Sequence, residues 1–195
     1  MAQKERSVKG RILGILGIVL IAAALTLTLW NFAASKKAAS DAAVIAEELC
    51  ALMPEKSVGI SDGRENTAMP QAELGGENFV GVIEVPIYNK KLPIYNKWDA
   101  KTVAKFPCRF TGSVYDGTLI VGGSDAIGHF DFMENITVGD AVRITDMTGG
   151  VFEYTVAEIE ISESADAESL VSEHALTIFA RDTYTLKYVI VRCEK

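Results

Sequence analysis

The stretch AVRITDMTGGVFEYTVAEIEI, residues 141–161, decides the fold class. Runs that alternate apolar and polar residues stand on both sides of residues 146–150, which contain two adjacent glycines. This pattern is typical of antiparallel strands joined by a hairpin turn. Alternation directs one face of each strand to a core and the other face to water. The stretch therefore predicts antiparallel β-sheet.

Similar short runs precede and follow this stretch. Eight strands are expected, over residues 79–85, 92–95, 118–121, 141–145, 152–156, 157–161, 176–179 and 188–192. Only residues 166–173 have helix or loop character. Many short strands separated by turn signals predict an all-β barrel or sandwich, and residues 78–195 are enough to bury one core.

Charge and cysteine content narrow the functional classes. The chain has 195 residues and a net charge of −7, which argues against nucleic-acid binding because that needs clustered Lys and Arg. The cysteines are Cys50, Cys108 and Cys193, so a fully paired disulfide framework is excluded. One bridge, Cys108 to Cys193, and free thiols both stay open. The cysteine spacing fits no metal site, and no cofactor is expected.

The N-terminus predicts a membrane anchor. Residues 12–30 are apolar and, at 1.5 Å per residue, would cross about 28 Å, close to the thickness of a bilayer core. More basic residues precede this run than follow it, which places the N-terminus in the cytoplasm and the rest outside. A cleaved signal peptide, with residues 33–35 as the cleavage site, is the alternative. Its apolar core would normally span only about 7–15 residues.

These patterns divide the chain into five parts. We expect a cytoplasmic tail (1–11), a transmembrane helix (12–35), a stalk helix (36–54), a linker (55–77) and a β-domain (78–195). Ser40 or Asp41 is a candidate cap for the stalk helix, and Pro54 ends its pattern. The apolar stripe of that helix either lifts the domain from the bilayer or packs on the domain.

Several segments, in their order and spacing, resemble the sortase family, in particular clostridial-type members. They are 82–86 (VIEVP), 92–95 (LPIY), Trp98, 107–113 (PCRFTGS), 139–140 (GD), 145–149, 154–156 and 191–194 (VRCE). Sortases are membrane-anchored cysteine transpeptidases of Gram-positive bacteria that attach proteins to the cell wall or to pilins. The resemblance implies an eight-stranded β-barrel on the extracellular side, with catalytic His, Cys and Arg at set places.

At those places the chain carries other residues. The family's histidine motif matches residues 122–130 (GGSDAIGHF), which puts Ser124 at the histidine position and His129 at a later, non-catalytic histidine. The cysteine motif matches residues 177–181 (TIFAR), which puts Arg181 at the cysteine position. The family's arginine falls on Tyr188, with Lys187 as a possible stand-in.

The chemistry of these replacements predicts a catalytically degenerate sortase, or pseudoenzyme. A guanidinium has no lone pair with which to attack a peptide carbonyl, so Arg181 cannot form a thioester. A serine hydroxyl does not titrate near pH 7 and cannot shuttle the proton that the leaving amine needs. Tyr188 offers a neutral hydroxyl where an arginine would hold an oxyanion.

Three hypotheses for function follow. The first is a non-catalytic protein whose groove, formed by Ser124, Asp125, His129, Arg181 and Asp182, binds a sorting-motif peptide, a pilin or an active sortase. Arg181 would then recognise an acidic peptide or a carboxylate, unless Asp125 or Asp182 neutralises it within the fold.

The second hypothesis is an active transpeptidase with displaced residues. It would combine Cys108 or Cys193 with His129 or His174. The third is a structural module of the cell envelope without a groove ligand.

Overall fold

The computed structural model describes residues 5–60 and 68–195. Part of the expected cytoplasmic tail and part of the expected linker, residues 1–4 and 61–67, lie outside the described residues. The chain divides into two compact units, residues 1–37 and 38–195. The second unit contains the β-domain and the end of the N-terminal helix.

A single helix, α1 (Glu5–Leu52), takes the place of the separate transmembrane and stalk helices. No glycine or proline stands between Gly17 and Pro54, so nothing in the sequence breaks the helix before Pro54. Ser40 and Asp41 consequently lie inside the helix and cap nothing. Residues 10–52 are long and apolar enough to cross a membrane, a property that a signal sequence shares.

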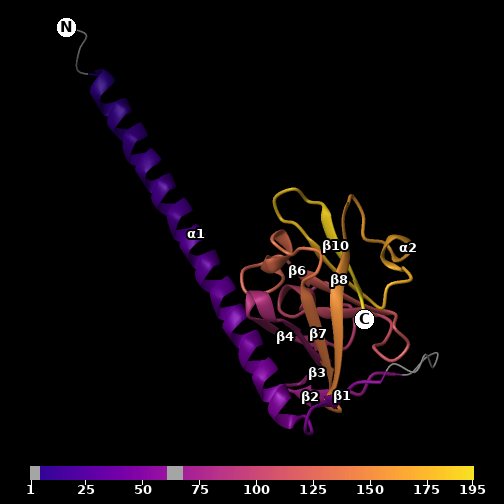
Figure 1. Ribbon diagram of the computed structural model, residues 1–195. Coiled ribbons are helices and arrows are strands. Elements are labelled where there is room, and N and C mark those ends of the chain that lie inside the picture. Colours follow the sequence, from indigo (N-terminus) through magenta and orange to yellow (C-terminus); the bar gives the residue numbers. More distant parts are fainter. Residues whose placement is uncertain (1–4, 61–67) are drawn as a thin grey trace. The chain divides into compact units, whose positions relative to one another are not determined.

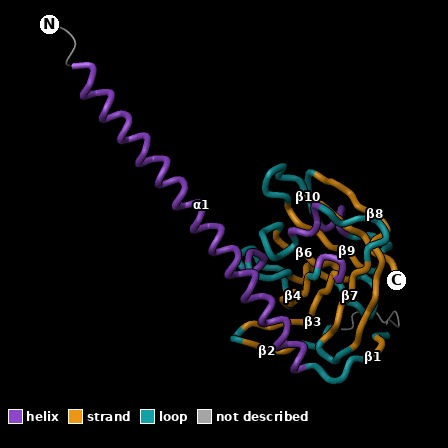
Figure 2. Tube along the Cα trace, turned by 60° about the vertical axis from the view of Figure 1, so that its left-hand side comes forward, coloured by secondary structure: helices purple, strands orange, loops and turns teal. Residues whose placement is uncertain are grey.

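The last turns of α1 pack on the β-domain. Ala42, Ala46 and Leu49, spaced four and three residues apart on one helical face, are fully buried in the core. Of the two roles left open for this apolar stripe, packing is therefore the one observed (Figure 2).

Ten strands and a few short helices follow α1. The strands are β1 (Ser57–Val58), β2 (Ala72–Leu74), β3 (Glu77–Val85), β4 (Lys90–Tyr95), β5 (Cys108–Thr111), β6 (Leu119–Ser124), β7 (Ala141–Asp146), β8 (Gly150–Ser162), β9 (Leu176–Arg181) and β10 (Tyr188–Glu194). The helices are η1 (Pro86–Tyr88), η2 (Thr102–Ala104), η3 (Asp131–Glu134) and α2 (Ala167–Leu170).

Strands β3 to β10 form an eight-stranded mixed barrel, which confirms the predicted fold class (Figure 1). The strand order is β8-β10-β9-β6-β5-β4-β3, and β7 closes the barrel by pairing with both β3 and β8. The pairs β6–β9 and β4–β5 are parallel, while the other neighbours in the barrel are antiparallel. The hairpin predicted at residues 146–150 joins β7 to β8, with Thr145 opposite Val151.

Two errors in the strand prediction cancel in the number of barrel strands, while β1 and β2 lie in the segment that was predicted as a linker. Residues 152–156 and 157–161 belong to one strand, β8, because no turn residue separates them. The first half of β8 pairs with β7 and the second half with β10. The strand β5 was missed because it is only four residues long and shows no clear alternation.

The sheet buries side chains on both of its faces. The main core lies inside the barrel and includes Ile178 and Ala180 of β9. A smaller cluster on the other face contains Ile120, Leu170, Phe179 and Ile190. Alternation along β9 therefore puts Phe179 and Arg181 on the outer face.

Candidate functional site

The structure brings together, on neighbouring strands, the three residues that the sequence predicted at sortase catalytic positions. Ser124, the last residue of β6, lies opposite Arg181, the last residue of β9. Tyr188, the first residue of β10, lies opposite Arg181 on its other side. Residues directly opposite each other in a ladder project to the same face. Ser124, Arg181 and Tyr188 therefore share the outer face at one end of the sheet.

Aromatic rings cover this face beneath Ser124 and Arg181. The Trp98 ring stacks on the Phe179 ring with centroids 5.4 Å apart, and Phe110 packs edge-on against both. Gly122, two residues before Ser124, makes this possible, because a Cβ there would overlap the rings of Trp98 and Phe179. Sequence reasoning missed this aromatic layer, although the glycine pair at 122–123 within a strand signals such a close approach.

Arg181 is solvent-exposed and has a defined orientation. Its Nε donates a hydrogen bond to the Leu186 carbonyl oxygen at 3.3 Å. Its guanidinium carbon lies 5.9 Å from the centroid of the Tyr188 ring. Within residues 5–60 and 68–195, its terminal Nη atoms have no hydrogen bond or ion pair. The guanidinium is thus held from one side and open on the other.

The two neighbouring aspartates bond to backbone and hydroxyl groups, and neither pairs with Arg181. Asp125 accepts hydrogen bonds from the Thr183 backbone N–H at 2.6 Å and from the Thr183 hydroxyl at 2.5 Å. Backbone N–H groups of Thr185 and Tyr184 bond to Asp182 and lower the pKa of its carboxyl. Both aspartates line a pocket of about 280 Å³ with Ala180 and Val189, which pack toward the main core.

Among the described residues, neither histidine has a hydrogen bond or ion pair with Arg181. His129 is only 1% exposed, and burial lowers the pKa of its imidazole. Its ring is therefore closed off from solvent rather than open to a groove. His174 lies between Glu158 and Glu194, with nitrogen–oxygen distances of 3.7 and 3.6 Å. In the described part of the chain, no hydrogen bond or ion pair joins either histidine to a cysteine.

The thiols are free and poorly suited to attack. Cys108 and Cys193 are fully buried, and burial raises their pKa values to about 11 and about 12. The strands β5 and β10 that carry them are separated by β6 and β9, and both cysteines are free thiols. A disulfide needs Cα atoms within about 7 Å, and two intervening strands keep the cysteines farther apart than that. Of the two states left open by the sequence, the structure therefore shows free thiols.

Lys187, the possible stand-in for the family's arginine, forms an ion pair with another residue. Its Nζ lies 2.8 Å from a carboxylate oxygen of Glu163. This hydrogen bond raises the pKa of Lys187. The ammonium group is therefore paired with Glu163, which lies in the connection between β8 and β9.

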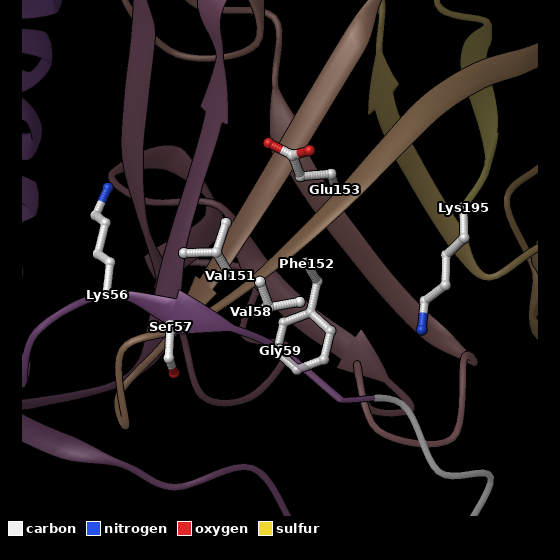
Figure 3. A pocket seen from close by; sticks show the side chains of 8 residues that line it. All are labelled: Lys56, Ser57, Val58, Gly59, Val151, Phe152, Glu153 and Lys195. Carbon is white, nitrogen blue, oxygen red and sulfur yellow. The ribbon is translucent and has the colours of Figure 1, made fainter.

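A pocket of about 450 Å³ lies between β1 and β8, away from these positions (Figure 3). Its lining consists of Lys56, Ser57, Val58, Gly59, Val151, Phe152, Glu153 and Lys195. The lining thus includes none of Ser124, Arg181 and Tyr188. Among the residues that the structure describes, no group of three His, Cys, Asp or Glu side chains is placed to hold a metal ion.

Comparison with solved structures identifies the fold. Sortase C from Clostridium perfringens SM101 superposes with a TM-score of 0.52 at 17% identity, over 84% of this chain and 88% of that one. Sortase C1 of GBS pilus island 1 gives 0.54 at 17% identity, over 80% and 82%. Sortase A of Listeria monocytogenes gives 0.51 at 20% identity, over 60% and 88%.

No protein-family model and no curated protein matches the chain. At these identities the likeness to sortases of classes A, C and D concerns the fold. The chain has the sortase-like fold, an eight-stranded mixed β-barrel preceded by a long apolar helix.

Proposed function

We propose that this chain is a membrane-anchored, extracytoplasmic sortase-fold protein that lacks transpeptidase activity and binds a partner of the cell envelope. The observation that carries the proposal is the ladder that pairs Arg181 with Ser124. We assign these two residues to the nucleophile and histidine positions of a sortase, on the sequence resemblance. Acyl transfer needs a nucleophile there, and a guanidinium supplies none.

The properties of the remaining thiols support the loss of activity. A nucleophilic cysteine works as a thiolate and needs solvent access, whereas Cys108 and Cys193 are buried with raised pKa values. His129, the histidine nearest to Ser124 in sequence, is buried and has no hydrogen-bond partner for either ring nitrogen in the described residues. A displaced Cys–His pair therefore has no support in these contacts.

The partner that we propose is a sorting-motif peptide, a pilin or an active sortase. The sortase-like barrel would present it with the outer face of β6, β9 and β10, where Ser124, Arg181 and Tyr188 lie. The apolar run of α1 would hold this face at the outer side of the membrane, with the N-terminus in the cytoplasm.

The test is a transpeptidation assay on the full chain in detergent micelles, with sorting-motif peptides and an amine acceptor. We expect no cleaved peptide and no amine adduct. Cleavage that a thiol-blocking reagent abolishes would refute the proposal. The triple variant Ser124→His, Arg181→Cys, Tyr188→Arg is the matched control. It restores the family's residues on the same three strands and should gain measurable turnover.

A further inference from the structure

The loop between β9 and β10, residues 182–187, is tightly ordered by its own hydrogen bonds. The Asp182 backbone N–H donates to the Lys187 carbonyl at 2.8 Å, and the Leu186 N–H donates to the Asp182 carbonyl at 2.9 Å. Asp125 ties the loop to the end of β6 through its two bonds with Thr183. The loop is therefore prearranged beside Arg181, and little conformational entropy remains to be lost when a ligand binds.

This ordered loop exposes two large side chains. Tyr184 is 89% exposed and Leu186 is 58% exposed. Leu186 also has a φ of +60°, a left-handed conformation that leucine rarely adopts. Such backbone strain is concentrated at ligand clamps and other functional sites. Here the strained residue supplies the carbonyl that accepts the hydrogen bond from Arg181 Nε.

Arg181 and this loop together form a candidate binding site for a planar anion. Its Nε and its ring contact with Tyr188 orient the guanidinium, while its Nη atoms are unpaired among the described residues. Arginine binds carboxylates through two parallel N–H···O bonds. A ligand that places a carboxylate on Arg181 would bring its neighbouring residues to Tyr184 and Leu186.

We propose that Arg181 and the 182–187 loop together bind a peptide segment in which a carboxylate side chain is flanked by apolar side chains. The inference rests on the proposed function and names the class of ligand for that face. The peptide needs a carboxylate because a negative charge complements the guanidinium of Arg181, whose Nη atoms are unpaired among the described residues. The exposed Tyr184 and Leu186 call for the apolar flanks, because aromatic and aliphatic anchors beside an arginine are typical of binding hot spots.

Three synthetic peptides test this inference on the full chain in detergent micelles. The first is acetyl-Ala-Leu-Glu-Leu-Ala-amide, the second has Gln in place of Glu, and the third has Ser in place of both Leu residues. Titration calorimetry gives the dissociation constants. We expect the first peptide to bind about tenfold more tightly than the second, the discrimination typical of a charged hydrogen bond. It should also bind more tightly than the third.

Protein variants assign that preference to residues. Arg181→Gln should abolish the preference for Glu over Gln, and Arg181→Lys should keep part of it. Tyr184→Ser should lower the affinities for the Glu peptide and the Gln peptide by the same factor. Arg143→Gln is the matched control, because Arg143 is an arginine on β7 paired with Glu84 and Glu153. It should leave all three affinities unchanged.

Equal affinity for the Glu and Gln peptides, no binding of either, or a preference that survives Arg181→Gln would overturn the inference. These outcomes leave the transpeptidation assay unaffected. Turnover in that assay would instead remove the proposed function, whatever the peptides do. The two failures are therefore distinguishable.

Discussion

At the residue scale, burial decides what the ionisable side chains near the barrel can do. His129 is buried with an imidazole pKa below its usual value, and burial is the largest cause. The charge of Lys90 lowers the pKa further. The charge of Asp131 raises it, but by less than burial lowers it. The folded protein therefore prefers the neutral ring.

This preference predicts a loss of stability in acid. In the unfolded chain His129 binds a proton as pH falls through about 6.5, whereas the folded protein resists protonation. Its contribution is present above that pH and is lost as pH falls toward the folded-state pKa, by up to about 1.4 kcal/mol per pH unit. Urea unfolding at pH 7, 6 and 5 measures the free energy of unfolding. This free energy should decrease less with falling pH in the His129→Leu variant than in the unaltered protein. An unchanged decrease would contradict the prediction.

The three thiols should differ in reactivity. Cys108 and Cys193 are buried with pKa values near 11 and 12, while Cys50 is only partly buried. Thiolates are the reactive species, so we expect one thiol to be labelled quickly at pH 8 and the other two only after unfolding. A colorimetric thiol assay with and without denaturant measures this. Rapid labelling of Cys108 or Cys193 in the folded protein would be the contrary result.

At the element scale, the hairpin between β7 and β8 depends on one buried carboxylate. Asp146 is almost completely buried and accepts hydrogen bonds from Thr148 N, Thr148 Oγ1 and Gly150 N at 2.7–2.8 Å. The Tyr115 hydroxyl donates to its other oxygen at 2.5 Å. This side chain fixes the turn that sets the register of two barrel strands.

Removing that carboxylate should therefore destabilise the barrel. We expect Asp146→Ala to lower the free energy of unfolding by about 3 kcal/mol, because it leaves buried donors without acceptors. Asp166→Ala, which removes the exposed cap of α2, should cost only about 1 kcal/mol. Urea denaturation compares the two variants. Equal losses would show that Asp146 does not hold the hairpin.

Local sequence patterns predicted most of the strands. They were less informative about which strands and side chains meet across the sheet. Alternation and the glycines at 149–150 predicted the β7–β8 hairpin because both act between neighbours in sequence. The resemblance to sortases singled out Ser124, Arg181 and Tyr188, and the ladders place these three residues side by side. Their equivalence to catalytic positions stays a prediction. The burial of His129 and the separation of Cys108 from Cys193 depend on contacts between distant segments, which no local pattern encodes.

At the scale of the whole molecule, the β-domain begins well before residue 78. Ala42, Ala46 and Leu49 of α1 and Met69 belong to the buried core, and β1 pairs with β8 through Ser57 and Val58. A domain that began at residue 78, as predicted, would lack these side chains. The apolar core surface that they cover would then be exposed to solvent. The compact unit begins at residue 38.

Two fragments should therefore behave differently. Residues 38–195 should unfold cooperatively, whereas residues 78–195 should lose several kcal/mol of stability or bind a dye that recognises exposed apolar surface. Each fully buried Leu or Met side chain contributes about 1.5–3 kcal/mol. Thermal unfolding followed by circular dichroism compares them. Equal melting temperatures would contradict a structural role for the end of α1.

We propose that no group among the described residues of this barrel forms a covalent acyl intermediate, because we assign Arg181, which pairs with Ser124, to the nucleophile position. Intact-mass spectrometry of the full chain after incubation with a sorting-motif peptide tests it most directly. We expect a mass identical to that of the untreated protein. A mass increase equal to the acyl part of the peptide, lost on treatment with hydroxylamine, would contradict it.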